Sequence, residues 1–212
     1  LKNIVKKTID NFETSGLESL DHKKPYLFIG NHRDITLDSA LCNFSLDSVG
    51  LETTYNAIGD NLVSVGWMGD LLRLNKSFVI SRSGDSKKEI YSNLLKASEF
   101  IKKTLHSGKH VWIAQKQGRS KDGLDKTDPA VLKMLHIALR KECKFEELTD
   151  YYNIVPQSVS YEIDPLAKEK GMHLQGESTK NENDDISHIF KGVMKFKGNV
   201  NLSFGEQLSG NY

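Results

Sequence analysis

Short apolar runs alternate along the 212-residue chain with segments in which apolar residues recur at helical spacing. Apolar runs bounded by turn-forming residues are typical of buried strands, and apolar positions three or four residues apart are typical of helices packed on a core. The runs that we interpret as strands are 25–30 (PYLFIG), 52–59, 77–82, 109–115 (KHVWIAQ), 153–162 and 198–206. The segments that we interpret as helices are 38–46, 61–75, 86–108 and 128–142. This alternation predicts an α/β fold, with a mixed, largely parallel sheet flanked by helices.

The helix signals differ in strength along the chain. Residues 86–108 give the clearest one, because apolar side chains recur at helical spacing and Gly108 is placed to end the helix. Residues 128–142 begin with Asp128, a good N-cap, followed by Pro129 at the first helical position. Residues 163–190 are polar and rich in Lys and Glu, so we expect a surface excursion there.

The N-terminal residues predict an amphipathic helix over about 1–14, within a single domain that covers residues 1–212. Such a helix either lies on the protein core or lies in a membrane interface, and the pattern leaves both open. The apolar side chains that share one face are Leu1, Ile4, Val5, Ile9 and Phe12.

Composition narrows the function classes. A formal net charge of +1 argues against a generally basic nucleic-acid binder, which needs clustered Lys and Arg. The two cysteines, Cys42 and Cys143, have no partner at metal-binding spacing, so we expect no metal site and a reducing, cytosolic compartment. The longest run without a charged residue or histidine is roughly 151–161, well short of the ~17 residues that cross a bilayer.

The segment NHRDITLD (31–38) follows the apolar run PYLFIG and begins like a protein-kinase catalytic loop, His-Arg-Asp. A kinase loop needs an asparagine five positions after its aspartate, and Ser39 occupies that position here. A glycine-rich nucleotide loop and a strand lysine would also have to precede it, and no Asp-Phe-Gly follows. We therefore exclude a kinase.

A histidine just beyond the end of a buried strand occupies the place where α/β folds carry their chemistry. Asp38 would lie in the first turn of the next helix, where its carboxylate can bind one ring nitrogen of His32 and leave the other to accept a proton. Asp34 suits helix capping better. The alternative for His32 is a loop histidine that bonds only to backbone.

The same segment resembles motif I of the glycerolipid acyltransferases, the glycerol-3-phosphate and 1-acylglycerol-3-phosphate acyltransferases. That family usually has four residues between His and Asp, whereas this chain has five. RLNKSFVISR (73–82) is similar to motif II, in which Phe78, Val79, Ile80 and Arg82 match. WIAQKQGRSKDG (112–123) is similar to motif III, with Gln117 in place of the usual acidic residue, and IVPQSVSY (154–161) to motif IV.

The resemblance implies a glycerolipid acyltransferase-like fold and an enzyme of phospholipid biosynthesis. It implies transfer of a fatty acyl group from acyl-CoA or acyl carrier protein to a hydroxyl of glycerol-3-phosphate or 1-acylglycerol-3-phosphate. His32 would be the general base and Asp38 its partner, with no cofactor because the thioester is already reactive. The residues expected to bind substrate are Arg82, Gln117, Gly118, Arg119, Ser120 and Lys121.

These residue types suit the proposed chemistry. A guanidinium group binds phosphate with two parallel hydrogen bonds, and Lys76 and Lys121 would add positive charge nearby. Backbone N–H groups around Gly118 and Ser120 would stabilise an oxyanion. The acyl chain also needs an apolar groove. Four apolar residues would either line this groove or pack in the core: Val63, Trp67, Met68 and Leu71.

Two other functions stay open at this point. Gln117 lacks the carboxylate charge, so the chain is alternatively a lipid- or acyl-carrier-binding relative with impaired catalysis. It is also compatible with a thioesterase that activates water. For the acyltransferase we expect a cytoplasmic location, peripheral on the inner face of the plasma membrane of a bacterial-type cell, with no nucleic-acid partner.

Overall fold

The computed structural model describes residues 1–63, 66–177 and 184–210, without the side chains of Trp67, Met68, Leu71 and Asp184. Within these residues, seven strands form one sheet in the order β1-β7-β6-β2-β5-β3-β4. The strands are β1 (Asn11–Ser15), β2 (Leu27–Gly30), β3 (Tyr55–Gly59), β4 (Ser77–Ile80), β5 (Val111–Ala114), β6 (Ile154–Tyr161) and β7 (Asn199–Phe204).

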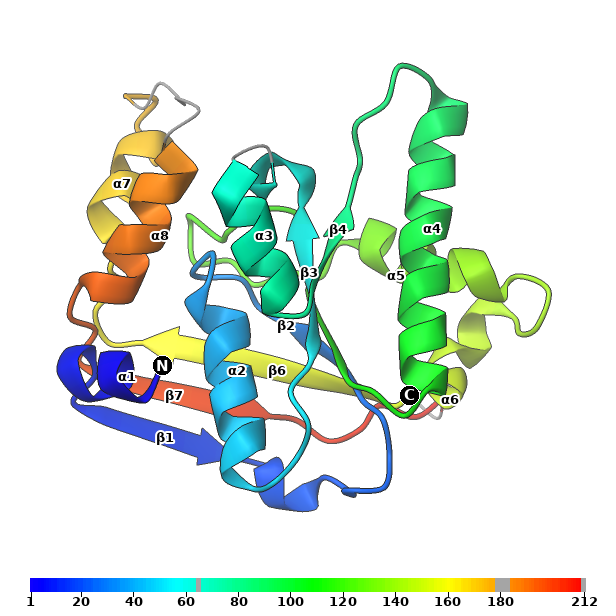
Figure 1. Cartoon of the computed structure of the whole chain (residues 1–212), viewed down its shortest axis with the longest axis horizontal. Coiled ribbons are helices and arrows are strands. Elements are labelled where there is room, and N and C mark those ends of the chain that lie inside the picture. Colours follow the sequence, from blue (N-terminus) through cyan, green and yellow to red (C-terminus); the bar gives the residue numbers. More distant parts are fainter. Residues whose placement is uncertain (64–65, 178–183, 211–212) are drawn as a thin grey trace.

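The strand directions make the sheet mixed and mostly parallel (Figure 1). Strands β6, β2, β5, β3 and β4 run parallel to one another, β7 is antiparallel to β6, and β1 is parallel to β7. The predicted fold class is therefore confirmed. The five parallel strands end at the same edge of the sheet, which is where α/β folds build their sites.

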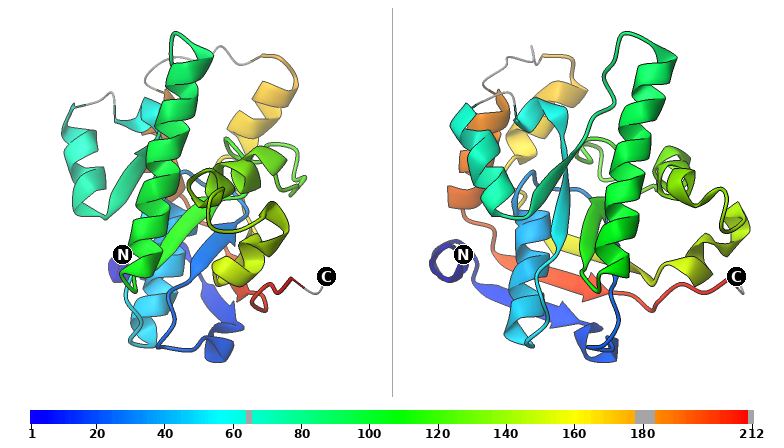
Figure 2. Two further views of the ribbon diagram at one scale, coloured as in Figure 1. Left: turned by 90° about the vertical axis from the view of Figure 1, so that its right-hand side faces the viewer. Right: turned by 45° about the vertical axis from the view of Figure 1, so that its right-hand side comes forward.

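Helices cover both faces of the sheet, as Figures 1 and 2 show from different sides. The helices are α1 (Lys2–Thr8), α2 (Leu37–Ser48), α3 (Gly66–Leu74), α4 (Lys87–His106), α5 (Pro129–His136), α6 (Leu148–Tyr151), α7 (Ala167–Leu174) and α8 (Asp184–Met194). No helix in the described ranges combines the length and the apolarity that crossing a bilayer requires.

Each face of the sheet has its own apolar core because side chains alternate along a strand. On one face, Phe28 of β2 packs in a cluster with Leu41 and Leu46 of α2. On the other face, Leu27 packs in a second cluster with residues of α4 and α5 such as Ile101. These two cores hold β2 and α2 in fixed positions, so the loop between them is anchored at both ends.

The N-terminus differs from the predicted helix over about 1–14. Helix α1 ends at Thr8, and residues from Asn11 onward form strand β1, which pairs with β7 along its whole length. The backbone N–H of Asp10 already donates to Gly198, so pairing with a distant strand ends the helix. The expected helix over residues 9–14 is therefore wrong.

The described parts of residues 163–190, which are 163–177 and 184–190, differ from the predicted surface excursion because they contain two helices. Helices α7 and α8 stand side by side at one end of the sheet, above α1 in Figure 1. The side chain of Lys170 is buried, because its ammonium group donates to the backbone of Arg33 and contacts Asp164. The two helices form a packed pair that lies against the loop following β2.

Candidate active site

His32 and Asp38 meet at the end of strand β2. The distance between His32 Nδ1 and Asp38 Oδ2 is 3.0 Å, and the Asp38 carboxylate is 1% exposed. The same oxygen accepts hydrogen bonds from the backbone N–H groups of Arg33 (2.7 Å) and Asp34 (2.9 Å). The fifth intervening residue therefore does not separate the pair, because the loop curls around the carboxylate.

The second oxygen of Asp38 is also occupied. Tyr161, on β6, donates its hydroxyl to Asp38 Oδ1 at 2.9 Å. Burial, and next the Asp38 charge, raise the pKa of the Tyr161 phenol well above its ordinary value, so the hydroxyl keeps its proton and acts as donor. Sequence reasoning missed Tyr161, although it is the last residue of the motif IV segment.

The hydrogen bond to Asp38 sets the protonation of the His32 ring. A carboxylate accepts, so His32 Nδ1 carries the proton and Nε2 is the nitrogen with a free lone pair. The ring lies edge-on to the indole of Trp112, with centroids 6.3 Å apart, and it lines a cavity. His32 therefore lies in the cavity wall, with Nδ1 bonded to Asp38.

Two further contacts fix the backbone on either side of His32. The amide side chain of Asn31 accepts from the N–H of Val159 at 2.8 Å and donates to its carbonyl at 3.0 Å, as a paired strand residue would. The carbonyl of His32 accepts from the N–H of Ser120 at 2.6 Å. The sequence placed Asn31 in the motif but gave no sign of this role.

Asp34 serves α2 as expected for a capping residue. Its Oδ1 accepts from the N–H groups of Thr36 and Leu37, at 2.9 Å each. The pKa of the Asp34 carboxyl is raised, first by burial and then by the charge of Asp38.

The cavity has a volume of about 300 Å³ and lies at the carboxyl ends of β2, β5, β3 and β4. Its charged lining consists of Arg82, Lys116, Arg119 and Lys121, together with Asp60 and Asp185. Of the expected site residues, those in the lining are His32, Arg82, Gln117, Gly118, Arg119 and Lys121. The structure thus brings residues from three of the four motifs to one hollow, and among the described residues of its lining four cations outnumber two carboxylates.

The two arginines of the cavity lining have different hydrogen-bond partners. Arg82 Nη1 donates to the Gln117 side-chain oxygen at 3.0 Å, and Arg119 Nη2 lies 3.1 Å from Nδ1 of His188 on α8. Gln117, which was expected to bind substrate, therefore accepts a hydrogen bond from an arginine in this structure. His188 was not predicted, because it lies outside all four motifs.

Several expected roles do not fit the structure. Ser120 is 1% exposed, and its N–H donates to His32, so this group does not stabilise an oxyanion. Lys76 precedes β4 and contacts Glu52 and Thr53, so it lies at the opposite end of that strand from the cavity. Val63 is not in the cavity lining, and the side chains of Trp67, Met68 and Leu71 lie outside the described part of the structure.

Comparison with known proteins gives two findings. The family model described as Acyltransferase matches residues 11–145, which is more than half of the chain. The crystal structure of the 1-acyl-sn-glycerophosphate (LPA) acyltransferase PlsC from Thermotoga maritima shares the fold, with a TM-score of 0.50 and 14% sequence identity. The alignment covers 99% of this chain and 68% of that one. No match was found among curated proteins.

Proposed function

The chain belongs to the acyltransferase family, and we propose that it transfers a fatty acyl group from a thioester to the hydroxyl of glycerol-3-phosphate or 1-acylglycerol-3-phosphate. The observation that carries the proposal is the His32–Asp38 pair in the wall of a cavity that also holds Arg82 and Arg119. The two acceptors belong to one chemical class, because each has a glycerol hydroxyl and a phosphate monoester. Glycerol-3-phosphate is the smaller of the two, and 1-acylglycerol-3-phosphate is the larger.

The reaction needs a base for the acceptor hydroxyl. His32 Nε2 takes the hydroxyl proton as the oxygen attacks the thioester carbonyl carbon. A C–O bond forms, the C–S bond then breaks, and the leaving thiolate takes the proton back from the imidazolium. Asp38, held at 3.0 Å from Nδ1, stabilises the positive charge of the ring between these two transfers.

The phosphate of the acceptor is the proposed partner of the cationic lining. A phosphate monoester carries ≈ −1.5 to −2 charges at neutral pH, and the excess of cations over carboxylates in the cavity complements that charge. Guanidinium groups suit it best, because their planar donors match phosphate oxygens in pairs. We assign this role first to Arg82 and Arg119, with Lys121 nearby.

The donor is acyl-CoA or acyl carrier protein, and the proposal includes no cofactor and no acyl-enzyme. A thioester is reactive enough to be attacked directly by the deprotonated hydroxyl. The thiol of Cys42 lies buried in the core, where burial raises its pKa, and Cys143 is likewise outside the cavity lining. A cysteine nucleophile therefore plays no part in the proposed mechanism.

An acceptor comparison tests the proposal. With a long-chain acyl-CoA as donor, thiol release is measured with glycerol-3-phosphate, with lysophosphatidate, with glycerol and without an acceptor. We expect release only with an acceptor, and a kcat/KM at least ~10-fold higher for the phosphate-bearing acceptors, since hydrogen bonds to charged groups contribute about 1.5–3 kcal/mol. Release that is equally fast without an acceptor would instead identify a thioesterase.

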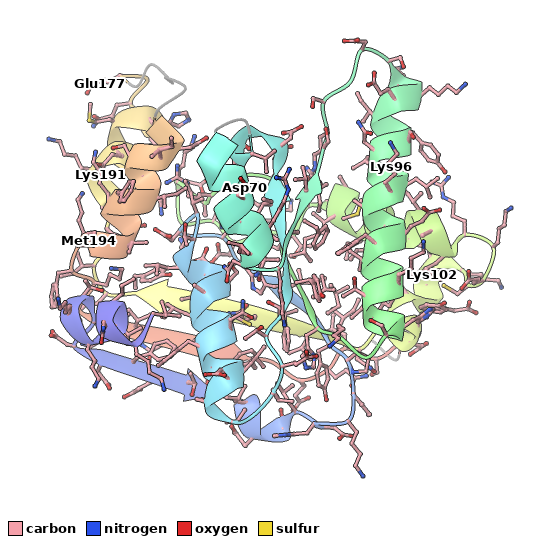
Figure 3. The ribbon with its side chains drawn as sticks, viewed as in Figure 1. Asp70, Lys96, Lys102, Glu177, Lys191 and Met194 are labelled. Atoms are coloured by element: carbon pink, nitrogen blue, oxygen red, sulfur yellow. The ribbon has the colours of Figure 1, made fainter. Side chains whose placement is uncertain are left out.

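We also propose that the enzyme is cytoplasmic and peripheral on the inner face of the plasma membrane. Phe190, Met194 and Phe196 are 56%, 68% and 47% exposed on α8 and just after it. Figure 3 labels Met194 and Lys191 on α8, and Lys191 pairs with Glu169 of α7 at 2.9 Å. Helix α1 contacts α8 and carries three exposed lysines, Lys2, Lys6 and Lys7. Apolar side chains flanked by lysines suit the surface of an anionic bilayer.

Vesicle binding checks this location. Replacing both Phe190 and Met194 with Glu is expected to weaken binding to vesicles of phosphatidylglycerol and phosphatidylcholine by about 100-fold, because each apolar side chain contributes about 1.5–3 kcal/mol on burial. The matched control is Val49→Glu, which changes an exposed apolar residue at the far end of α2. Equal binding by the double variant and the control would show that α8 does not face the membrane.

A further inference from the structure

Helices α7 and α8 lie outside residues 11–145, the part that matches the family model, yet they contact the loops of the site. Lys170 of α7 donates to the carbonyl of Arg33 at 2.8 Å. On α8, a Cβ added at Gly192 would lie 2.1 Å from a carboxylate oxygen of Asp34, so only glycine allows this close approach. The helical pair is thus packed directly against the loop that carries His32.

One side chain of α8, that of His188, contacts an arginine of the cavity lining. Arg119 Nη2 and His188 Nδ1 are 3.1 Å apart, and both side chains are half-buried. A guanidinium group only donates hydrogen bonds, so Nδ1 of His188 must be the acceptor and its proton must be on Nε2. His188 therefore binds Arg119 as a neutral imidazole.

The same arrangement holds for the other arginine of the cavity. Arg82 donates to the amide oxygen of Gln117, which is also neutral. Within the described residues, neither guanidinium forms an ion pair with a carboxylate. A neutral acceptor restricts the orientation of an arginine without cancelling its charge, whereas a carboxylate would do both. Both guanidinium charges thus stay available to a bound anion.

We propose that His188 is a positioning residue for the acceptor: it holds Arg119 in the orientation that binds the phosphate. Gln117 does the same for Arg82, which gives a physical reason for an amide in place of the usual acidic residue. This inference rests on the proposed function, because it takes the acceptor to be a phosphate monoester. If His188 has this role, helix α8, which lies outside the residues matched by the family model, contributes to acceptor affinity.

Steady-state kinetics of His188→Ala and His188→Asn test the inference, with glycerol-3-phosphate as acceptor and saturating acyl-CoA. Loss of one hydrogen bond predicts a KM for glycerol-3-phosphate ~3- to 10-fold higher in the alanine variant, with kcat unchanged. Asparagine offers an amide oxygen as acceptor, so His188→Asn is expected to restore KM to within about 2-fold. His188→Asp would raise KM above the alanine value, because its carboxylate pairs with Arg119.

Two controls separate positioning from general damage. Ser187→Ala changes an exposed neighbour on α8 and is expected to leave KM unchanged. The KM for glycerol, which lacks phosphate, is expected to be the same in His188→Ala and the unaltered protein. An unchanged KM for glycerol-3-phosphate in His188→Ala, or an equal rise for both acceptors, would overturn the inference.

A binding measurement keeps this test independent of the reaction. Calorimetric titration with glycerol-3-phosphate is expected to give a Kd ~3- to 10-fold higher for His188→Ala than for the unaltered protein, even if acyl transfer to that acceptor is not detected. If the unaltered protein binds glycerol-3-phosphate but transfers nothing to it, the proposed reaction fails and the role of His188 stands. If both proteins bind it equally, the role of His188 fails.

Discussion

The His32→Ala variant is expected to lose most of the acyl-transfer rate, with kcat falling ~10²- to 10⁴-fold, the usual contribution of a general base. The KM for glycerol-3-phosphate is expected to change little, because we assign phosphate binding to Arg82 and Arg119. The physical reason is that, in the proposed mechanism, Nε2 of His32 accepts the hydroxyl proton while Nδ1 is held by Asp38 at 3.0 Å. Thiol release and ester formation, followed in the same reaction, measure this change.

Two variants distinguish the chemistry of His32 from its packing. Asp38→Asn keeps the size of the side chain but removes the charge that stabilises the imidazolium, so we expect a loss of kcat approaching that of His32→Ala. Tyr161→Phe removes one of the hydrogen bonds to Asp38 and is expected to cost less, about 2- to 10-fold. A His32→Ala protein that is folded and keeps more than about a tenth of kcat would contradict the role of the histidine.

The second large effect is expected from Arg119. Because hydrogen bonds to charged groups contribute about 1.5–3 kcal/mol, Arg119→Ala is expected to lower kcat/KM for glycerol-3-phosphate by ~10- to 150-fold. The loss is expected mainly in KM, and it should be much smaller for glycerol, which offers no phosphate. Kinetics with the two acceptors side by side measure the difference.

Arg119→Lys and Arg73→Ala complete this comparison. Lysine keeps the charge but lacks the planar pair of donors, so Arg119→Lys is expected to recover only part of the lost affinity. Arg73 is 72% exposed on α3, where it pairs with Asp70, and its replacement by alanine is expected to have no effect. An equal loss for glycerol and glycerol-3-phosphate in Arg119→Ala would show that the arginine does not bind phosphate.

The parallel part of the sheet and the place of His32 follow from local patterns. Apolar runs such as PYLFIG have to be buried, and alternating helices force neighbouring strands to run parallel, so their carboxyl ends share one edge. That argument alone brings His32, Arg82 and the segment around Arg119 toward one another. The structure agrees, because all three line one cavity.

The N-terminus shows what local patterns miss. Residues from Asn11 to Ser15 form strand β1 because β7, nearly 190 residues later in the sequence, offers a free edge for parallel pairing. Only Phe12 of this strand is even half-buried. An exposed edge strand carries little hydrophobic alternation, so nothing in those residues distinguishes it from the end of an amphipathic helix.

Helices α7 and α8 were missed for two different reasons. Lys170 is buried in α7 by hydrogen bonds to the loop after β2, and a buried lysine looks like an exposed one in a sequence. In α8, by contrast, Ile186, Ile189 and Val193 are spaced as one face of a helix, and this signal was present among the polar residues. Neither pattern predicts that His188 meets Arg119, because that contact depends on how the helical pair packs.

The most direct test of the account is the ratio of ester formed to thiol released. The unaltered protein is incubated with a long-chain acyl-CoA and glycerol-3-phosphate, and both products are quantified over time. If His32 directs an acceptor hydroxyl at the thioester, one acylated glycerol-3-phosphate forms for each thiol, and both nearly stop without the acceptor. Thiol release that continues at full rate without the acceptor, with the acyl group recovered as free fatty acid, would contradict it.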